Sequence, residues 1–140
     1  MKYIKYLPPL SLVVLLIDLI LSFFLNRKGL CIFNHGIAFG LTVSNIYEIN
    51  IALLLVLITL AILINNELSY LLFSLTILGM GNTISRFLFN GVCDYISFLY
   101  LSFNLSDIAI VSICSLAIIQ ILPIKKKPLC IQKGVKREDK

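Results

Sequence analysis

Hydrophobic residues fall into four long runs along the chain, and polar residues collect in the segments between them. The runs are Leu10–Leu25, Ile51–Ile64, Leu68–Ile84 and Leu105–Ile124. A transmembrane helix needs about 20 mainly apolar residues, so the pattern predicts four membrane spans. They are expected over about 8–25, 48–65, 68–88 and 102–123. The second run reaches this length only by including polar neighbours, which leaves a re-entrant segment open there.

Helix-end signals agree with this reading. Pro8 and Pro9 suit the first turn of a helix, where a missing N–H leaves no hydrogen bond unmade. Residues 65–67 leave room only for a tight turn between the second and third spans. In the third run, Gly79 and Gly81 allow a neighbouring helix to approach closely. The pattern therefore predicts a bundle of helices joined by short turns.

Two longer segments, Asn26–Glu48 and Phe89–Asn104, fall on the same side of this bundle. The first contains "CIFNHGIAFGL" (31–41), which mixes β-forming residues with two glycines and predicts a short strand or hairpin on the membrane. The expected fold class is an all-α membrane protein, with four transmembrane helices and a small extramembrane β segment on the outer face.

Composition excludes an ordinary soluble domain. Hydrophobic residues make up 59% of the chain and charged residues 14%, against about 45–50% and about 25% in soluble domains. The net charge is +5, but seven of the twelve basic residues lie in 125–140, and Lys2 and Lys5 lie near the start. Basic ends that flank apolar spans predict cytoplasmic termini. They also favour membrane lipids over nucleic acid as the partner.

Residues 1–124 are therefore expected to form one four-helix membrane domain, and 125–140 a disordered basic cytoplasmic tail. The first run resembles the apolar core of a signal peptide. It is longer than the usual 7–15 residues or so and no small-residue cleavage site follows it. It also carries Asp18. A retained first span is the better interpretation.

The four cysteines show no CxxC spacing, and His35 is the single histidine. A metal site usually needs three or four closely placed ligands, so neither a metal nor another cofactor is expected. Cys31 and Cys93 fall on the same predicted side and can pair, although unpaired thiols are the favoured interpretation. His35 indicates an exposed loop rather than a catalytic base.

Aspartates at membrane depth carry the candidate chemistry. An ionisable group at a helix centre costs roughly 2.5–3.5 kcal/mol on insertion scales and marks a functional site by default. Asp107 is placed about six residues into a helix that starts near Leu101, roughly 9 Å along its axis. Asp94 follows the third span, in a loop long enough to let the two carboxyl groups meet near the outer face.

Two facing carboxyl groups at low dielectric share one proton. The charged one can activate water, and the protonated one can donate to a carbonyl oxygen, which gives amide hydrolysis without a nucleophilic side chain. Structural alternatives are a helix-capping Asp94 and a buried Asp107 bonded to Asn or Ser. Asn104 is expected on the helix face of Asp107, and Asn82 on that of Arg86, for which snorkelling to lipid headgroups is the alternative.

Four blocks then resemble the signature of lipoprotein signal peptidase, signal peptidase II. They are "FNHGIAFG" (33–40), "GMGNTISRF" (79–87), "GVCDYI" (91–96) and "FNLSD" (103–107). That family is a four-span bacterial aspartic intramembrane protease. It removes signal peptides from lipoproteins after a diacylglyceryl group is attached to the cysteine that follows the cut. The resemblance covers roughly residues 10–122.

The resemblance implies a role for each matching residue. Asp94 and Asp107 match the catalytic pair, and Asp18 matches a first-span aspartate that is structural rather than catalytic. Gly79 and Gly81 are also structural. Five further positions match residues that hold substrate: Asn34, Gly36, Asn82, Arg86 and Asn104.

The resemblance also implies a multi-pass protein of the bacterial cell (inner) membrane, with its active site near the outer face. Lipid-modified precursor proteins are the expected substrates, and a monomer is expected. Three serines depart from the family pattern: Ser22 replaces a lysine, Ser85 an aspartate and Ser106 an alanine.

Two other classes of function stay open. A non-catalytic relative would bind lipidated peptides without cutting them, and Ser22 and Ser85 favour that alternative. A small proton-coupled transporter would use Asp18 and Asp107, but many transporters contain internal repeats and none is visible here.

Overall fold

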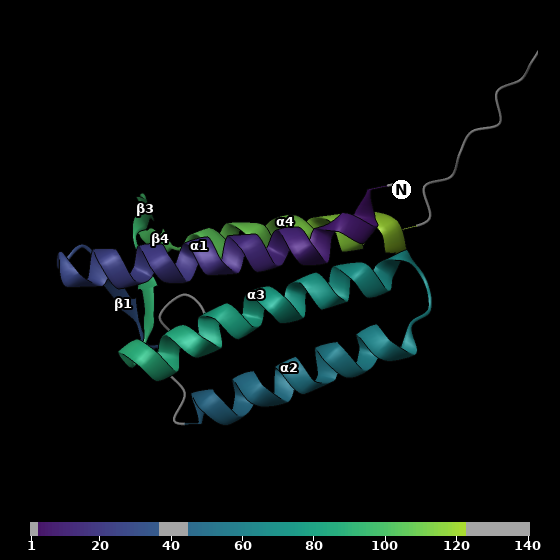
Figure 1. Ribbon diagram of the computed structural model, residues 1–140, viewed down its shortest axis with the longest axis horizontal. Coiled ribbons are helices and arrows are strands. Elements are labelled where there is room, and N and C mark those ends of the chain that lie inside the picture. Colours follow the sequence, from purple (N-terminus) through teal and green to yellow (C-terminus); the bar gives the residue numbers. More distant parts are fainter. Residues whose placement is uncertain (1–2, 37–44, 123–140) are drawn as a thin grey trace, which may run out of the picture.

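The computed structural model describes residues 3–36 and 45–122 (Figure 1). The predicted tail at 125–140 and part of the first outer segment lie outside these residues. Within these residues the long helices run side by side, and short strands gather at one end of the bundle, which we call the strand end (Figure 1). The helices are α1 (Leu7–Arg27), α2 (Ile46–Leu63), α3 (Glu67–Phe89) and α4 (Leu105–Ile121), and a 3-10 turn, η1 (Ile4–Tyr6), precedes α1.

Helix α3 is the centre of the bundle, because α1, α2 and α4 all pack against it. The start of α1 and the end of α4 lie together at the end opposite the strands (Figure 1). Among the described residues, three helical segments are long and apolar enough to cross a membrane: Ile4–Arg27, Ile46–Leu63 and Glu67–Phe89. The apolar helix α4 is shorter, at 17 residues.

Local signals set most helix ends. Pro8 and Pro9 lie in the first turn of α1. Asn66 caps α3, where its side-chain oxygen accepts a hydrogen bond from the Leu68 N–H at 2.8 Å. Asn90 ends α3 in a left-handed conformation with φ of 57°, a common way to close a helix. Helix α2 is one unbroken helix of 18 residues, which counts against the re-entrant alternative.

Small polar residues are buried between the helices, and large apolar residues face outward, as in membrane proteins. The buried stripe of α1 is Ser11, Leu15, Asp18 and Ser22, spaced at helical intervals. The buried residues of α3 likewise include serines and threonines, whereas large aliphatic and aromatic side chains cover the outside. Small polar groups inside and apolar groups outside suit a bundle whose solvent is hydrocarbon.

The two glycines of α3 permit close packing on two sides. A Cβ at Gly79 would lie 2.9 Å from Cδ2 of Leu54 on α2, and one at Gly81 would lie 3.1 Å from Cγ of Leu15 on α1. A larger residue at either position would therefore require the facing leucine side chain to shift.

In the part of the chain that the structure describes, four three-residue strands form two small antiparallel sheets at the strand end. Strand β1 (Ile32–Asn34) pairs with β2 (Val92–Asp94), and β3 (Ile96–Phe98) pairs with β4 (Leu101–Phe103). A strand in the first outer segment is confirmed. Its partner comes from the segment that follows α3, so the two outer segments are joined into one platform.

Two expectations are wrong. Cys31 and Cys93 are not free thiols but form a disulfide, with their Cα atoms 5.0 Å apart. Pairing of β1 with β2 brings them together, a contact that separation along the chain cannot reveal. Helix α4 begins at Leu105 rather than near Leu101, because Leu101–Phe103 pairs as β4. Asp107 therefore lies in the first helical turn instead of deeper in the span.

Candidate active site

Asp94 is the last residue of β2 and is 1% exposed. Neither of its carboxyl oxygens has a hydrogen-bond partner among the described residues. Burial, and then the charge of Asp107, raise the pKa of Asp94 to about 7. The nearby side chains of Asn34 and Arg86 oppose this shift, while the charge of Asp18 adds to it. Asp94 is thus poised to hold a proton near neutral pH.

Asp107 lies in the first turn of α4 and is held on both oxygens. The Asn82 amide donates to Oδ1 at 3.1 Å, and the Asn104 backbone N–H donates to Oδ2 at 3.2 Å. Asn104 caps the helix, since its side-chain oxygen accepts from the Asp107 N–H at 2.8 Å. Asn104 also donates to Asn82 Oδ1 at 3.1 Å. Such donors suit a charged carboxylate.

Asp94 and Asp107, the aspartate pair, therefore sit in unequal surroundings. The effect of the Asp107 charge on Asp94 shows that the two groups interact. Asp94 has no hydrogen-bond partner among the described residues, whereas Asp107 accepts from two donors. A pair with one proton offers an acid and a base at the same place. The structural alternative for Asp107 was a hydrogen bond to asparagine or serine, and Asp107 does bond to Asn82 and Asn104. These bonds are also compatible with a role as the general base.

Asp18 links the surroundings of both members of the pair. Its Oδ1 accepts from the Tyr95 hydroxyl at 2.5 Å and from the Leu105 N–H at 3.2 Å, and its Oδ2 accepts from the Ser106 hydroxyl at 2.7 Å. Burial and the bond to Asp18 raise the pKa of Tyr95, so the phenol remains a donor. Tyr95 directly follows Asp94, and Ser106 directly precedes Asp107. The buried Asp18 carboxylate on α1 therefore accepts a hydrogen bond from the chain neighbour of each aspartate.

Sequence reasoning did not assign Tyr95 or Ser106 to the site. Ser106 could have been found from the sequence, because it replaces the alanine that the family has at this position. A buried hydroxyl group beside Asp107 needs a hydrogen-bond partner, and that partner is Asp18. Ser85, another departure, donates to the Gly91 carbonyl at 3.3 Å and so joins α3 to the turn before β2. Ser85 therefore has its partner in the platform, whereas Ser106 has its partner on α1.

Arg86 points inward rather than to lipid headgroups. It is 6% exposed, and its guanidinium donates to the Gly36 carbonyl at 2.7 Å and to the Asn34 carbonyl at 3.5 Å. The Asn34 side chain in turn accepts from the Gly36 N–H at 3.0 Å. Arg86 thus fixes the chain that leaves β1, and snorkelling does not account for its position.

His35 lies on the exposed side of the platform. Its ring contacts the Asn90 carbonyl at 2.7 Å and stacks on Phe33. This fits an exposed loop residue. Within residues 3–36 and 45–122, no group of three or more His, Cys, Asp or Glu could hold a metal ion.

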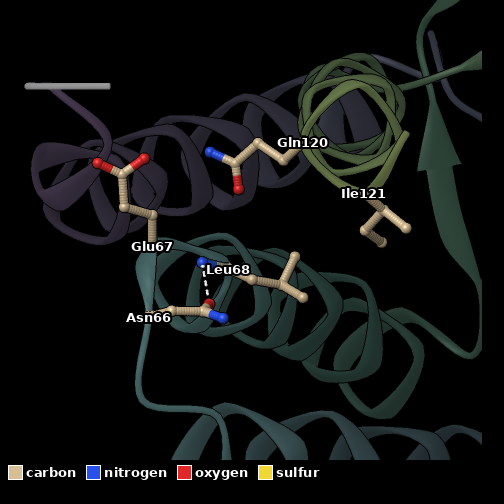
Figure 2. Close-up of a pocket in the computed structure, with 5 residues that line it drawn as sticks. All are labelled: Asn66, Glu67, Leu68, Gln120 and Ile121. Atoms are coloured by element: carbon tan, nitrogen blue, oxygen red, sulfur yellow. Dashed lines mark hydrogen bonds between the residues drawn. The ribbon is translucent and has the colours of Figure 1, made fainter. Parts of the chain in front are cut away.

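A cavity of about 470 Å³ lies far from the aspartate pair, between the start of α3 and the end of α4 (Figure 2). Figure 2 shows Gln120 reaching from α4 toward the start of α3. The cavity contains neither Asp94 nor Asp107, so hydrolysis has no acid–base pair there. Its lining residues are Asn66, Glu67, Leu68, Gln120 and Ile121.

The predicted catalytic and substrate-binding residues lie on elements that meet at the strand end, where hydrogen bonds join Asn82 and Asn104 to Asp107, and Arg86 to Asn34 and Gly36. A family model described as signal peptidase (SPase) II matches residues 10–123. The chain belongs to this family. It is therefore a membrane protein and a peptidase, from a family of aspartic proteases that process lipoproteins. No significant match is found among curated proteins or solved structures.

Within the signal peptidase II family, the contacts described above add detail to the predicted roles. Asn82 and Asn104 contact Asp107 directly, while Arg86 holds the segment that contains Asn34 and Gly36. Asp18 contacts neighbours of the pair rather than the pair itself. Gly79 and Gly81 face other helices. Catalysis by the pair and substrate binding by the other five residues remain predictions.

Proposed function

We propose that this protein removes signal peptides from diacylglyceryl-modified prolipoproteins by cutting immediately before the lipidated cysteine. The observation that carries the proposal is the unequal aspartate pair in a chain of the signal peptidase II family. Asp94 is buried without a donor, and Asp107 accepts hydrogen bonds on both oxygens. This arrangement supplies an acid and a base for the direct addition of water to an amide.

In the first step, Asp107 removes a proton from a water molecule while the water oxygen attacks the scissile carbonyl carbon. Asp94 gives its proton to the carbonyl oxygen, and the product is a neutral tetrahedral diol. In the second step, Asp107 returns its proton to the amide nitrogen and the C–N bond breaks. One diol hydroxyl gives its proton to Asp94. The pair ends with one proton on Asp94, as it began.

Neighbouring residues act by fixing geometry. Asn82 and Asn104 hold the Asp107 carboxylate, so that its basic oxygen has one orientation toward the water. Arg86 keeps the Asn34–Gly36 chain beside the pair, where backbone and amide groups can align an extended peptide. Alignment of reacting groups can lower the activation barrier of a reaction by about 7–11 kcal/mol. Loss of a positioning residue is therefore expected to slow hydrolysis.

The proposed location is the bacterial cell membrane, with four spans, cytoplasmic termini and the strand end at the outer face. Three of the described segments have the length and hydropathy for spanning, and α4 packs beside α3 and α1 along the same bundle. Both described ends of the chain lie opposite the strands (Figure 1). Basic residues at those ends favour the cytoplasmic side. The protein is proposed to act as a monomer.

The lipid on the substrate is proposed to act by orientation. Its acyl chains lie in the bilayer before and after binding, so transfer from water contributes little to affinity. Anchoring instead holds the scissile bond at the height of the aspartate pair, and thereby replaces contacts to a long peptide sequence. The four short strands offer little surface for contacts with a long peptide.

The test compares diacylglyceryl-modified and unmodified forms of one precursor, with the purified protein in lipid bilayers. We expect cleavage of the modified form and almost none of the unmodified form, measured by mass spectrometry. A parallel preparation of Asp94→Asn serves as the blank for contaminating proteases. Equal cleavage of both forms would reject lipid recognition, and tight binding without cleavage would favour the non-catalytic alternative.

A further inference from the structure

The Cys31–Cys93 disulfide joins the two outer segments beside the aspartate pair. Cys93 is the middle residue of β2, directly before Asp94, and Cys31 directly precedes β1. The strand register places Ile32 opposite Asp94 and Phe33 opposite Cys93. The bond therefore links chain segments 62 residues apart, and it does so one residue before the candidate acid.

Strand β2 pairs with β1, packs against α3, α1 and β4, and is joined to Cys31 by the disulfide. Within the described residues, the sheet of β1 and β2 has two strands of three residues. A two-stranded sheet is marginally stable by itself, so the position of β2 depends on its packing and on the disulfide. The Asp94 carboxyl group has no hydrogen bond among the described residues that would hold it directly. Its position is consequently set by the backbone of β2, whereas Asp107 is held by its own hydrogen bonds.

We propose that the Cys31–Cys93 disulfide is the positioning element that holds Asp94 against Asp107, so that the peptidase works in its disulfide-bonded form. The catalytic part of this inference rests on the proposed function. The same bond holds the start of β1, which continues into the segment that Arg86 binds. Opening the disulfide therefore frees Asp94 and the adjacent predicted substrate segment together.

Reduction is a two-electron exchange with a dithiol reagent. A reagent thiolate attacks one cysteine sulfur, the S–S bond breaks, and the second reagent thiol releases the mixed disulfide. The products are two protein thiols and an oxidised, cyclic reagent. Cys93 is fully buried and Cys31 is half-buried, so attack is expected at the Cys31 sulfur. An outer-face site lies in a compartment where disulfides persist.

The experiment uses the full-length protein with Cys114→Ser as the matched control. Cys114 is a free cysteine on α4, so this substitution leaves the disulfide and the site intact. Oxidised protein, dithiothreitol-reduced protein and Cys31→Ser/Cys93→Ser are compared for kcat and KM on the lipid-modified precursor. Alkylation followed by mass spectrometry counts the thiols in each sample.

We expect kcat of the reduced and doubly substituted forms to fall by about 10²-fold, the scale expected for a displacement of about 1 Å in a reacting group. Reoxidation should restore the reduced wild-type protein and leave the double variant unchanged. Cys114→Ser should behave as wild type in both redox states. Helical content measured by circular dichroism should persist, because α1, α2 and α4 pack directly against α3.

A second readout does not require substrate. The pKa of Asp94 is followed by NMR of protein with ¹³C-labelled aspartate, with Asp94→Asn used for assignment. The charged groups that face Asp94 are Asp107 on α4, Arg86 on α3 and Asp18 on α1. Release of β2 should hydrate Asp94 and move it from Asp107, so its pKa should fall from about 7 toward the ordinary range.

The two readouts separate this inference from the proposed function. An oxidised protein that never cuts the lipid-modified precursor would reject the proposed function, while the Asp94 resonance still decides whether the disulfide positions that carboxyl group. Unchanged kcat together with an unchanged Asp94 pKa after complete reduction would overturn the inference. A fall of kcat that tracks loss of helical content, with no earlier change at Asp94, would also overturn it.

Discussion

The β2 side of the candidate site carries a carboxyl group with no hydrogen-bond partner among the described residues, whereas the α4 side carries one that accepts on both oxygens. Asp94 is held through its backbone, by the pairing of β2 with β1 and by the adjacent disulfide. Side-chain amides and a helix cap hold Asp107 directly. Two identical side chains are thus supported in different ways, as expected for an acid and a base that work together.

Replacement of either aspartate has the largest expected effect. Asp94→Asn and Asp107→Asn are nearly isosteric, so packing should survive while proton transfer is lost. General acid–base catalysis contributes about 10²–10⁴-fold, and kcat should fall by at least that factor in each variant. The measurement is kcat on the lipid-modified precursor, with the exposed carboxylate variant Glu48→Gln as the matched control. Normal turnover by either aspartate variant would exclude the aspartyl mechanism.

Removal of a donor on the α4 side should have an intermediate effect. Asn82→Ala deletes the hydrogen bond to Asp107 Oδ1, and a bond to a charged group contributes about 1.5–3 kcal/mol. We expect kcat to fall roughly 10- to 100-fold with a smaller change in KM, because the carboxylate loses its fixed orientation. Asn65→Ala, in the turn at the opposite end of the bundle, is the control. An Asn82→Ala enzyme with wild-type kcat would show that Asn104 alone supports Asp107.

The pH dependence tests the β2 side. The pKa of Asp94 is raised to about 7 by burial and by Asp107. Above that pH the acid is lost, so kcat should fall about tenfold per pH unit in bilayers. The folded protein also binds this proton more tightly than the unfolded chain does. Its contribution to stability is therefore present below the ordinary pKa of an aspartate and is lost as the pH rises through about 7.

A control on this profile comes from Asp107→Asn. The substitution removes the charge that helps to raise the pKa of Asp94, so the Asp94 resonance of this variant should titrate at lower pH than in the wild-type protein. A profile that stays flat between pH 6 and pH 9 or so would contradict a protonated Asp94 as the acid.

The smallest effects on chemistry are expected from residues that join the two sides. Asp18→Asn should lower the amount of folded protein more than its specific activity, because the buried carboxylate accepts from Tyr95, Leu105 and Ser106. Ser106→Ala removes one of these bonds and should cost about 1 kcal/mol of stability with specific activity close to wild type. Thermal unfolding and activity per folded molecule check both variants. A larger loss of kcat than of stability in Asp18→Asn would place that residue in the chemistry.

The sequence by itself determined the helices, because their signals are local. Four apolar runs, prolines in a first turn and an asparagine cap act within a few residues of where they stand. Lipid as the solvent makes long apolar segments helical, since every backbone polar group must be satisfied internally. The two candidate aspartates were also visible, because carboxylates stand out in a chain so poor in charge, and the family blocks mark the same positions.

Only the tertiary structure decided how those aspartates differ. The groups that surround β2 leave the carboxyl oxygens of Asp94 without a hydrogen-bond partner among the described residues. The two donors to Asp107 come from α3 and from the residue that caps α4. The start of α4 moved to Leu105 because β4 pairs with β3. The Cys31–Cys93 bond follows from strand pairing between segments 62 residues apart. Long-range pairing of this kind has no local signature, because its partners meet only once the bundle has brought both outer segments to one end.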